Sequence, residues 1–251
     1  MEKITYKERS KFYSSEIEKN KYLFNFLITL KNRLKINSTV LIPCASGIYS
    51  DDFSKVFELN YFMDIEESMI EELKLNLSLN KIKNIYPLVK NMNDSLNIKV
   101  DAIFVLDQGI QFLNHIEFYN FLKIQMKFSK YIILDMYDFF SNNDDKLNYY
   151  NNKENINYKE FIFNNKLYKR EITYKKDSKG IKLFYNYNND KHKNIYNSNI
   201  YLYNYNLKQT INIINSIKKI KIKSIYKNYL FERYLNNNRY ILILEVTKWI
   251  V

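Results

Sequence analysis

The sequence predicts an α/β fold: a doubly wound, Rossmann-like and mostly parallel seven-stranded sheet, with an antiparallel β layer inserted after the fifth strand. Two observations lead to this prediction. Over the first 140 residues, short and continuously apolar runs alternate with amphipathic helical segments, which is typical of a parallel sheet covered on both faces. After residue 140 the segments are rich in Tyr, Phe, Ile and Thr, which favours antiparallel strands.

The first part of the chain alternates between helix and strand. A helix is expected over residues 15–34, because leucines recur there at helical spacing after a capping box formed by Ser15 and Glu18. Apolar runs predict strands at residues 39–42, 62–64, 86–89, 102–106 and 131–134. Apolar helical faces follow the second and fourth of these strands, at residues 65–77 and 118–126.

The last part of the chain is expected to form the β layer and then to return to the sheet. Gly180 ends a turn signal between residues 172–174 and 181–184, which predicts a hairpin. Further strands are expected at 199–205, 222–230 and 239–248, a helix at 207–214, and exposed loops in the Asn-rich stretches 142–157 and 186–199. The predicted domains are a core of residues 1–140 and 206–251, and a substrate-covering layer of residues 141–205.

Composition argues against several classes of protein. Two His and one Cys are too few for a zinc cage or a disulfide scaffold, so no metal site is predicted. No apolar run approaches the roughly 20 residues of a membrane-spanning helix, and the N-terminus lacks a signal-peptide pattern, so a cytoplasmic protein without a membrane partner is expected. The net charge of +12 is explained either by AT-rich codon usage or by a phosphate-bearing partner, a small molecule or a nucleic acid.

Two residues at strand ends indicate a ligand site. Gly47 lies in a turn of small residues after the first strand, where glycine lets a ligand approach the backbone, although an ordinary turn would also use it. Asp64 ends the second strand, where a carboxylate binds ribose hydroxyls in dinucleotide folds, or otherwise caps a helix. The turn lacks the full G-x-G-x-x-G spacing, which disfavours a nicotinamide cofactor.

The order of these motifs resembles the class I S-adenosylmethionine-dependent methyltransferases over most of the chain. Residues 39–47, TVLIPCASG, are similar to that family's first strand and its G-C-G-x-G turn, and residues 61–69, YFMDIEESM, to its second-strand motif. The β layer resembles that of a small-molecule branch in which antiparallel strands cover the pocket. Pro43 and Ala45 replace glycines of the first motif, and Leu41 stands where an acidic residue is common.

The resemblance implies S-adenosylmethionine as the cofactor and assigns residues to it. The implied cofactor-binding residues are Tyr13, Cys44, Ala45, Gly47, Asp64, Ile65, Asn91, Met92, Asp107 and Gln108. Within this set Asn91 and Met92 would lie near the adenine, Asp107 and Gln108 beside the reactive methyl group, and Tyr13 in a lid. The candidates for holding the substrate are Gln111, Tyr137 and Asp138.

The implied function is methylation of a small polar metabolite, and O-methylation of a sugar hydroxyl on a nucleotide-linked sugar is the favoured reaction. His115, after the fourth strand, is the candidate base because His is well matched to neutral pH; otherwise it is a surface residue at a helix start. The alternatives are N-methylation of a small amine, a non-catalytic domain of this fold, and an RNA or DNA methyltransferase. The net charge favours the last alternative, whereas the lack of an N-P-P-Y type sequence after the fourth strand opposes it.

Overall fold

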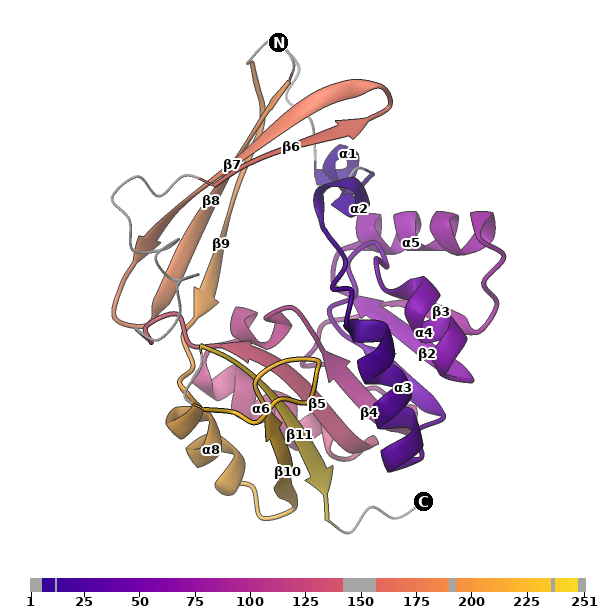
Figure 1. Ribbon diagram of the computed structural model, residues 1–251, viewed down its shortest axis with the longest axis vertical. Helices are drawn as coiled ribbons and strands as arrows, with labels where there is room; N and C mark the ends of the chain where they lie inside the picture. Colours follow the sequence, from indigo (N-terminus) through magenta and orange to yellow (C-terminus); the bar gives the residue numbers. More distant parts are fainter. Residues whose placement is uncertain (1–5, 12, 142–156, 190–192, 236–237, 248–251) are drawn as a thin grey trace.

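The computed structural model describes residues 6–11, 13–141, 157–189, 193–235 and 238–247. These residues form two separate sheets with helices around the larger one, as Figure 1 shows. No helix in this part of the chain is long and apolar enough to cross a membrane, and no cluster of His, Cys, Asp and Glu in it has the arrangement of a metal site.

The larger sheet has seven strands in the order β10-β11-β5-β4-β1-β2-β3. Its strands are β1 (Ser38–Leu41), β2 (Leu59–Asp64), β3 (Ile85–Val89), β4 (Val100–Val105), β5 (Ser129–Tyr137), β10 (Ile220–Tyr226) and β11 (Arg239–Val246). Along the sheet, the five neighbouring strands β3, β2, β1, β4 and β5 pair in parallel. The strand β11 is antiparallel to both β5 and β10. The strand order reverses between β1 and β4, and a doubly wound sheet binds ligands beyond the carboxyl ends of the strands at such a point.

Helices cover both faces of the larger sheet. The helices are α3 (Leu23–Leu34), α4 (Ser50–Val56) and α5 (Glu67–Leu79) on one face, and α6 (His115–Gln125) and α8 (Leu207–Asn215) on the other. Successive side chains of a strand point to opposite faces of the sheet. Leu41 therefore packs in the core under α3, α4 and α5, and Val40 in the core under α6 and α8. Because both faces are buried, the strands need continuous apolar runs, and the predicted α/β fold class is confirmed.

The smaller sheet has four strands in the order β6-β7-β8-β9 and is antiparallel throughout; we call it the roof. Its strands are β6 (Asn157–Phe163), β7 (Lys166–Lys176), β8 (Gly180–Asn189) and β9 (Asn194–Tyr203). The hairpin predicted around Gly180 joins β7 and β8, and the Asp177 carboxylate fixes its turn by accepting hydrogen bonds from the amides of Lys179 and Gly180. The domain boundaries proposed from the sequence stay a prediction.

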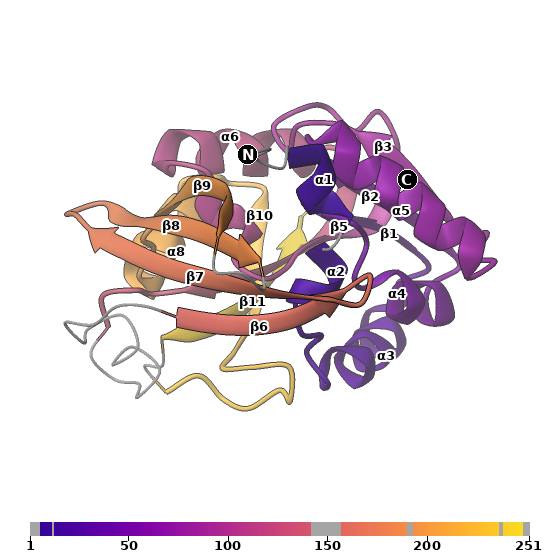
Figure 2. The same cartoon turned by 90° about the horizontal axis from the view of Figure 1, so that it is seen from above.

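The N-terminal helices α1 (Tyr6–Ser10) and α2 (Tyr13–Glu16) are tied to the roof, and Figure 2 shows them beside it. Glu16 is 1% exposed and accepts hydrogen bonds from the Tyr187 hydroxyl at 2.8 Å and from Arg170 Nη1 at 2.6 Å. Arg9 Nε donates to the Tyr187 hydroxyl at 3.0 Å. We call these four residues the clasp, because they join the first two helices to β7 and β8.

Two predicted elements differ from the structure. The single helix expected over residues 15–34 is interrupted, since α2 ends at Glu16 and α3 begins at Leu23. Asn20 forms the break, because its side chain accepts a hydrogen bond from the Tyr22 amide and its carbonyl accepts one from the Leu23 amide. The capping box expected from Ser15 and Glu18 is therefore wrong.

The second difference concerns the Asn-rich stretch 186–199, which was expected to be an exposed loop. Residues 186–189 belong to β8 and residues 194–199 to β9, where Asn186 pairs with Asn197 and Tyr187 with Tyr196. Tyr187 is fully buried in the roof, so the tyrosines rather than the asparagines decide the structure. Of the other Asn-rich stretch, residues 142–156 lie outside the described residues.

Candidate functional site

Two adjoining cavities lie between the larger sheet and the roof. The Asp64 chamber has a volume of about 660 Å³ and the Asp107 chamber about 430 Å³, and both fall within the roughly 300–1,000 Å³ of small-molecule sites. The two chambers share lining residues from α2, the turn after β1, the end of η1 (Gly109–Phe112) and the roof: Tyr13, Pro43, Ala45, Phe112, Tyr185 and Ile200. One ligand or two adjacent ligands can therefore extend through both.

The turn after β1 forms the floor between the chambers. Ala45 has a positive φ of 47°, and its amide donates to Asp64 Oδ2 at 2.8 Å. Cys44 also lines the Asp107 chamber but is only 3% exposed, and burial, with the nearby Asp64 carboxylate, holds the pKa of its thiol well above the ordinary value. Pro43 and Ala45 thus bring small side chains, instead of bare backbone, to the cavity.

Gly47 serves the turn from its other side. Its φ is 80°, and a Cβ added there would lie 2.3 Å from Leu73 Cδ1 and 2.6 Å from Ser50 Oγ. Gly47 lines neither chamber. The space that this glycine leaves is therefore filled by the α5 core, and its structural role is to let the turn pass over Leu73.

Asp64 sits at the carboxyl end of β2 and lines its chamber with Ile65. Asp64 is 6% exposed, and its carboxylate accepts hydrogen bonds from the amides of Ala45 and Glu66, at 2.8 and 3.0 Å. Burial raises the pKa of Asp64 above its ordinary value, and the backbone hydrogen bonds oppose that shift. Each carboxylate oxygen accepts a hydrogen bond from one of these amides and keeps further acceptor capacity for a ligand.

The loop after β3 forms another wall of the Asp64 chamber. Asn91 and Met92 line it, and both are held by neighbouring groups. The Asn91 side chain accepts a hydrogen bond from the Asn93 amide at 2.9 Å, and the Met92 carbonyl accepts one from Gln125 Nε2 at 2.8 Å. The wall is thus fixed to α6 before any ligand arrives.

Asp107 and Gln108 follow β4 and line the second chamber. Both residues have positive φ, 48° and 66°, which turns the chain sharply into η1. The Tyr49 hydroxyl, at the start of α4, donates a hydrogen bond to Asp107 Oδ2. Burial and the negative charge of Asp135 raise the pKa of Asp107 to about 6, although the Tyr49 hydrogen bond and Arg239 lower it.

A buried ion pair supports Asp107 from behind. Asp135 of β5 is fully buried and accepts hydrogen bonds from Arg239 Nε at 2.9 Å and Nη2 at 2.7 Å. The same carboxylate accepts a hydrogen bond from the Tyr229 hydroxyl at 2.7 Å and one from the Asp107 amide at 3.1 Å. Asp135 thereby holds the backbone of Asp107, and its own charge is balanced by Arg239.

The three residues predicted to hold a substrate line neither chamber. Gln111 is fully buried; its Nε2 donates to the carbonyls of Tyr137 and Tyr203, both at 3.0 Å, and its Oε1 accepts from the Tyr137 amide. Gln111 therefore joins β5 to the end of the roof. Asp138 accepts hydrogen bonds from the Phe140 amide and from Asn204 Nδ2 and lines a third cavity.

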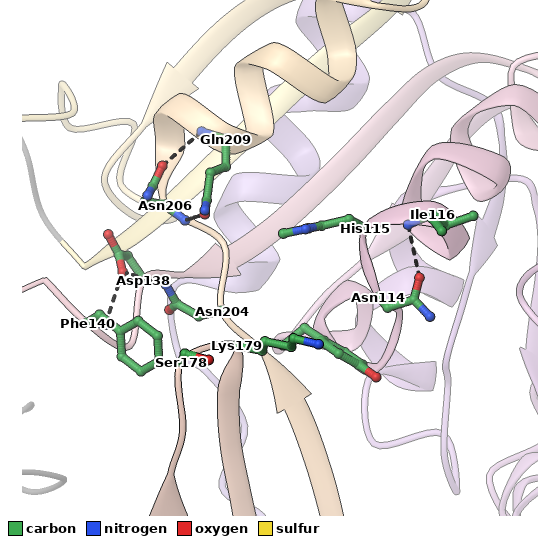
Figure 3. A pocket seen from close by; sticks show the side chains of 11 residues that line it. Asn114, His115, Ile116, Asp138, Phe140, Ser178, Lys179, Asn204, Asn206 and Gln209 are labelled. Carbon is green, nitrogen blue, oxygen red and sulfur yellow. Dashed lines mark hydrogen bonds between the residues drawn. The ribbon is translucent and has the colours of Figure 1, made fainter.

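This third cavity also holds His115, as Figure 3 shows. Its volume is about 830 Å³, and none of the residues that line the two chambers lines it. His115 is the first residue of α6, and its ring packs edge-on against Tyr205 with the centroids 4.8 Å apart. His115 therefore lies apart from the residues predicted to bind the cofactor. All of those predicted cofactor residues except Gly47 line one or both of the two chambers.

Sequence reasoning missed the residues that act across long distances in the chain. Tyr49 follows Gly47 by two positions and carries no motif, and Arg239 lies in a predicted final strand without any signal of its partner. The clasp residues Arg9, Glu16 and Arg170 were likewise ordinary charged residues in a basic chain. Only the pairing of β5 with β11 and of α2 with the roof reveals them.

Comparison with solved structures places this fold among known ones. A S-adenosylmethionine-dependent methyltransferase from Clostridium acetobutylicum matches with a TM-score of 0.75 and 11% identity, covering 96% of this chain and 98% of that one. The sugar N-methyltransferase KedS8 from a Streptoalloteichus species matches at 0.71 and 9% identity, covering 99% and 95%. CalS10, an amino pentose methyltransferase from Micromonospora echinaspora, matches at 0.69 and 9% identity, covering 98% and 100%.

No protein-family model matches the chain, and no curated protein matches it either. The likeness is therefore one of structure, and it extends over nearly the whole chain, the roof included. The chain has the fold of the class I S-adenosylmethionine-dependent methyltransferases, as its motifs predicted.

Proposed function

We propose that this protein is an S-adenosylmethionine-dependent methyltransferase that acts on a small polar metabolite. One observation carries the proposal: Asp64 ends β2 and Asp107 follows β4, the two strands on either side of β1, and their chambers adjoin beneath the roof. The first chamber offers a carboxylate where ribose hydroxyls are bound in related folds. The second leads on from it and has room for a methyl acceptor.

The residues present fit this cofactor. Asp64 keeps acceptor capacity beyond its two backbone hydrogen bonds, and Asn91 and Met92 form a fixed wall beside it for the adenine. Pro43 and Ala45 add little bulk where the family has glycine, and Ala45 keeps a glycine-like φ. When bound, the cofactor would supply an electrophilic methyl group toward the Asp107 chamber.

In this proposal the protein acts chiefly by enclosure and orientation. Methyl transfer is an in-line displacement, so holding the acceptor atom at near-attack distance lowers most of the barrier. Tyr13, Phe112 and Tyr185 belong to both chambers and would keep water from the junction between them. The clasp holds α2, which carries Tyr13, against the roof.

The favoured acceptor from the sequence is a hydroxyl of a nucleotide-linked sugar. An enclosed chamber lined by Tyr174 and Tyr185 supports a sugar-sized acceptor better than a polymer. The phosphate is less well supported, because the two chambers together are lined by five acidic residues, Glu18, Asp64, Glu66, Asp107 and Glu117, and three basic ones, Arg9, Lys90 and Arg170. A second candidate, a small amine, is favoured by the Asp107 carboxylate.

Calorimetry and a transfer assay test the proposal. We expect purified protein to bind S-adenosylmethionine and S-adenosylhomocysteine, and to transfer labelled methyl groups to members of a panel of nucleotide-linked sugars and the matching amino sugars. An RNA and a DNA pool serve as the polymer arm. No binding of either cofactor form would leave a non-catalytic domain of this fold, and labelling of a polymer alone would move the protein to the nucleic-acid class.

A further inference from the structure

Asp107 brings a negative charge without an ion pair to the lining of its chamber. Among the described residues no Lys, Arg or His forms an ion pair with it. The nearest cation in its network, Arg239, makes its two hydrogen bonds to Asp135 instead. Arg170, the basic residue that lines this chamber, is bound to Glu16. The carboxylate therefore faces the cavity with only the Tyr49 hydroxyl as a side-chain partner.

The remaining lining suits a cation. The face of an aromatic ring attracts an ammonium group, and five aromatic residues line this chamber: Tyr13, Tyr49, Phe112, Tyr174 and Tyr185. Arg9 already lies over the Tyr13 and Tyr185 rings, at 5.1 and 6.0 Å from their centroids. The other acidic lining residue, Glu18, pairs with Lys159 at 2.9 Å and has an 87% exposed side chain. Of the two carboxylates that line the Asp107 chamber among the described residues, Asp107 is the one without an ion pair.

Resting on the proposed methyltransferase function, we propose that Asp107 binds the ammonium form of an amine acceptor and takes one proton from it, with Tyr49 positioning the carboxylate. One N–H bond breaks, its electron pair stays on nitrogen as the lone pair that accepts the methyl group, and the proton moves to a carboxylate oxygen of Asp107. The substrate class is therefore an amine whose ammonium form carries at least one N–H bond. Asp107 is the catalytic residue here, and Tyr49 is a positioning residue.

The surroundings of Asp107 set the pH at which this works. The groups that face it are the Tyr49 hydroxyl from α4, Asp135 from β5 and Arg239 from β11, with Tyr229 behind Asp135. With a pKa of about 6, Asp107 is largely ionised at neutral pH and binds a cation there. Protonation below that pH removes the charge, so preference for an amine falls as the pH is lowered through about 6.

A matched pair of probes tests the inference without methyl transfer. We expect 2-phenylethylamine to bind at pH 7.5 about 10- to 100-fold more tightly than 2-phenylethanol, because only the ammonium gains a charged hydrogen bond. Titration calorimetry in the presence of S-adenosylhomocysteine gives both constants. In Asp107→Asn the two probes should bind equally, and Asp51→Asn, an exposed carboxylate on α4, should keep the preference. Equal binding by the unaltered protein, or a preference that survives Asp107→Asn, overturns the inference.

Carboxyl 13C NMR of the ligand-free protein adds a second readout. Asp107 should titrate near pH 6, and in Tyr49→Phe its titration should move to higher pH, since the hydrogen bond that Tyr49 donates lowers the pKa of Asp107. A titration unchanged in Tyr49→Phe contradicts the positioning role. If the unaltered protein does not bind S-adenosylhomocysteine at all, the proposed methyltransferase function is wrong. If it binds S-adenosylhomocysteine but does not prefer the amine, only the inference about Asp107 is wrong.

Discussion

The Tyr187 hydroxyl lies 2.8 Å from both carboxylate oxygens of Glu16, although 171 residues separate the two in the chain. This contact joins α2 to the middle of the roof, and Arg9 and Arg170 surround it with positive charge. The first helices are therefore part of the same wall as the antiparallel sheet, above both chambers.

The clasp makes Glu16 a sensitive position for stability. Glu16→Ala removes the buried carboxylate that pairs with both Arg9 and Arg170, and we expect a loss of about 3–5 kcal/mol in the free energy of unfolding. Urea denaturation followed by circular dichroism measures this. Glu18→Ala breaks the exposed pair with Lys159 and should leave stability nearly unchanged. Equal effects of the two substitutions would show that the clasp is not a buried ion pair.

Asp64 is predicted to hold the ribose of the cofactor. Asp64→Ala should weaken binding of S-adenosylhomocysteine by roughly 1–3 kcal/mol, because charge-assisted hydrogen bonds to the diol are lost. Calorimetry measures the affinity, and circular dichroism checks that the variant is folded. The control is Glu71→Gln, an exposed carboxylate on α5 that lines neither chamber. Unchanged affinity in folded Asp64→Ala would remove Asp64 from the site.

Gly47 is expected to matter for stability before it matters for binding. The sequence suggested that a ligand lies against this glycine, whereas the structure puts Leu73 there. Gly47→Ala should cost about 1–3 kcal/mol of unfolding free energy, from the positive φ and the crowding against Leu73. Gly47→Val should cost more. A Gly47 variant with an unchanged free energy of unfolding that no longer binds S-adenosylhomocysteine would support the prediction from the sequence that a ligand lies against this glycine.

His115 and Asp107 are rival candidates for the proton acceptor, and turnover can separate them. If His115 were the base, His115→Ala would lower turnover by roughly 10²- to 10⁴-fold. Because His115 lines the third cavity, we expect near-normal turnover from His115→Ala and a loss of that size from Asp107→Asn. Single-turnover rates with any acceptor found in the panel decide between them. The reverse pattern would favour His115 as the base and a hydroxyl as the acceptor.

The sequence predicts the site best where chemistry is carried by residues close together in the chain. The turn around Ala45 and the end of β2 at Asp64 follow directly from an apolar strand and its neighbours, and the structure joins them by a hydrogen bond. Gln111 could not be interpreted in this way, because its three hydrogen bonds go to Tyr137 on β5 and Tyr203 on β9. A local pattern says that a polar residue is near a strand end, but the packing decides whether it faces a cavity or the core.

The same limit applies to His115. Its position after β4 is shared with residues of the Asp107 chamber, yet η1 intervenes and carries the chain to the other side of that strand end. The direction of that short helix depends on the positive φ angles of Asp107 and Gln108, which no periodicity reveals. Proximity in sequence was therefore a poor guide to proximity in space.

The pairing of Asp135 with Arg239 has a consequence for how the protein is made. The two residues are 104 positions apart, and the roof is encoded between them. During synthesis β5 leaves the ribosome long before β11 does. Until then the edge of β5 that pairs with β11 stays open, and Asp135 lacks its Arg239 partner. This edge can close only after β11 has left the exit tunnel, and β11 follows the roof strands in the chain. The larger sheet is therefore completed only after the whole roof has been synthesised.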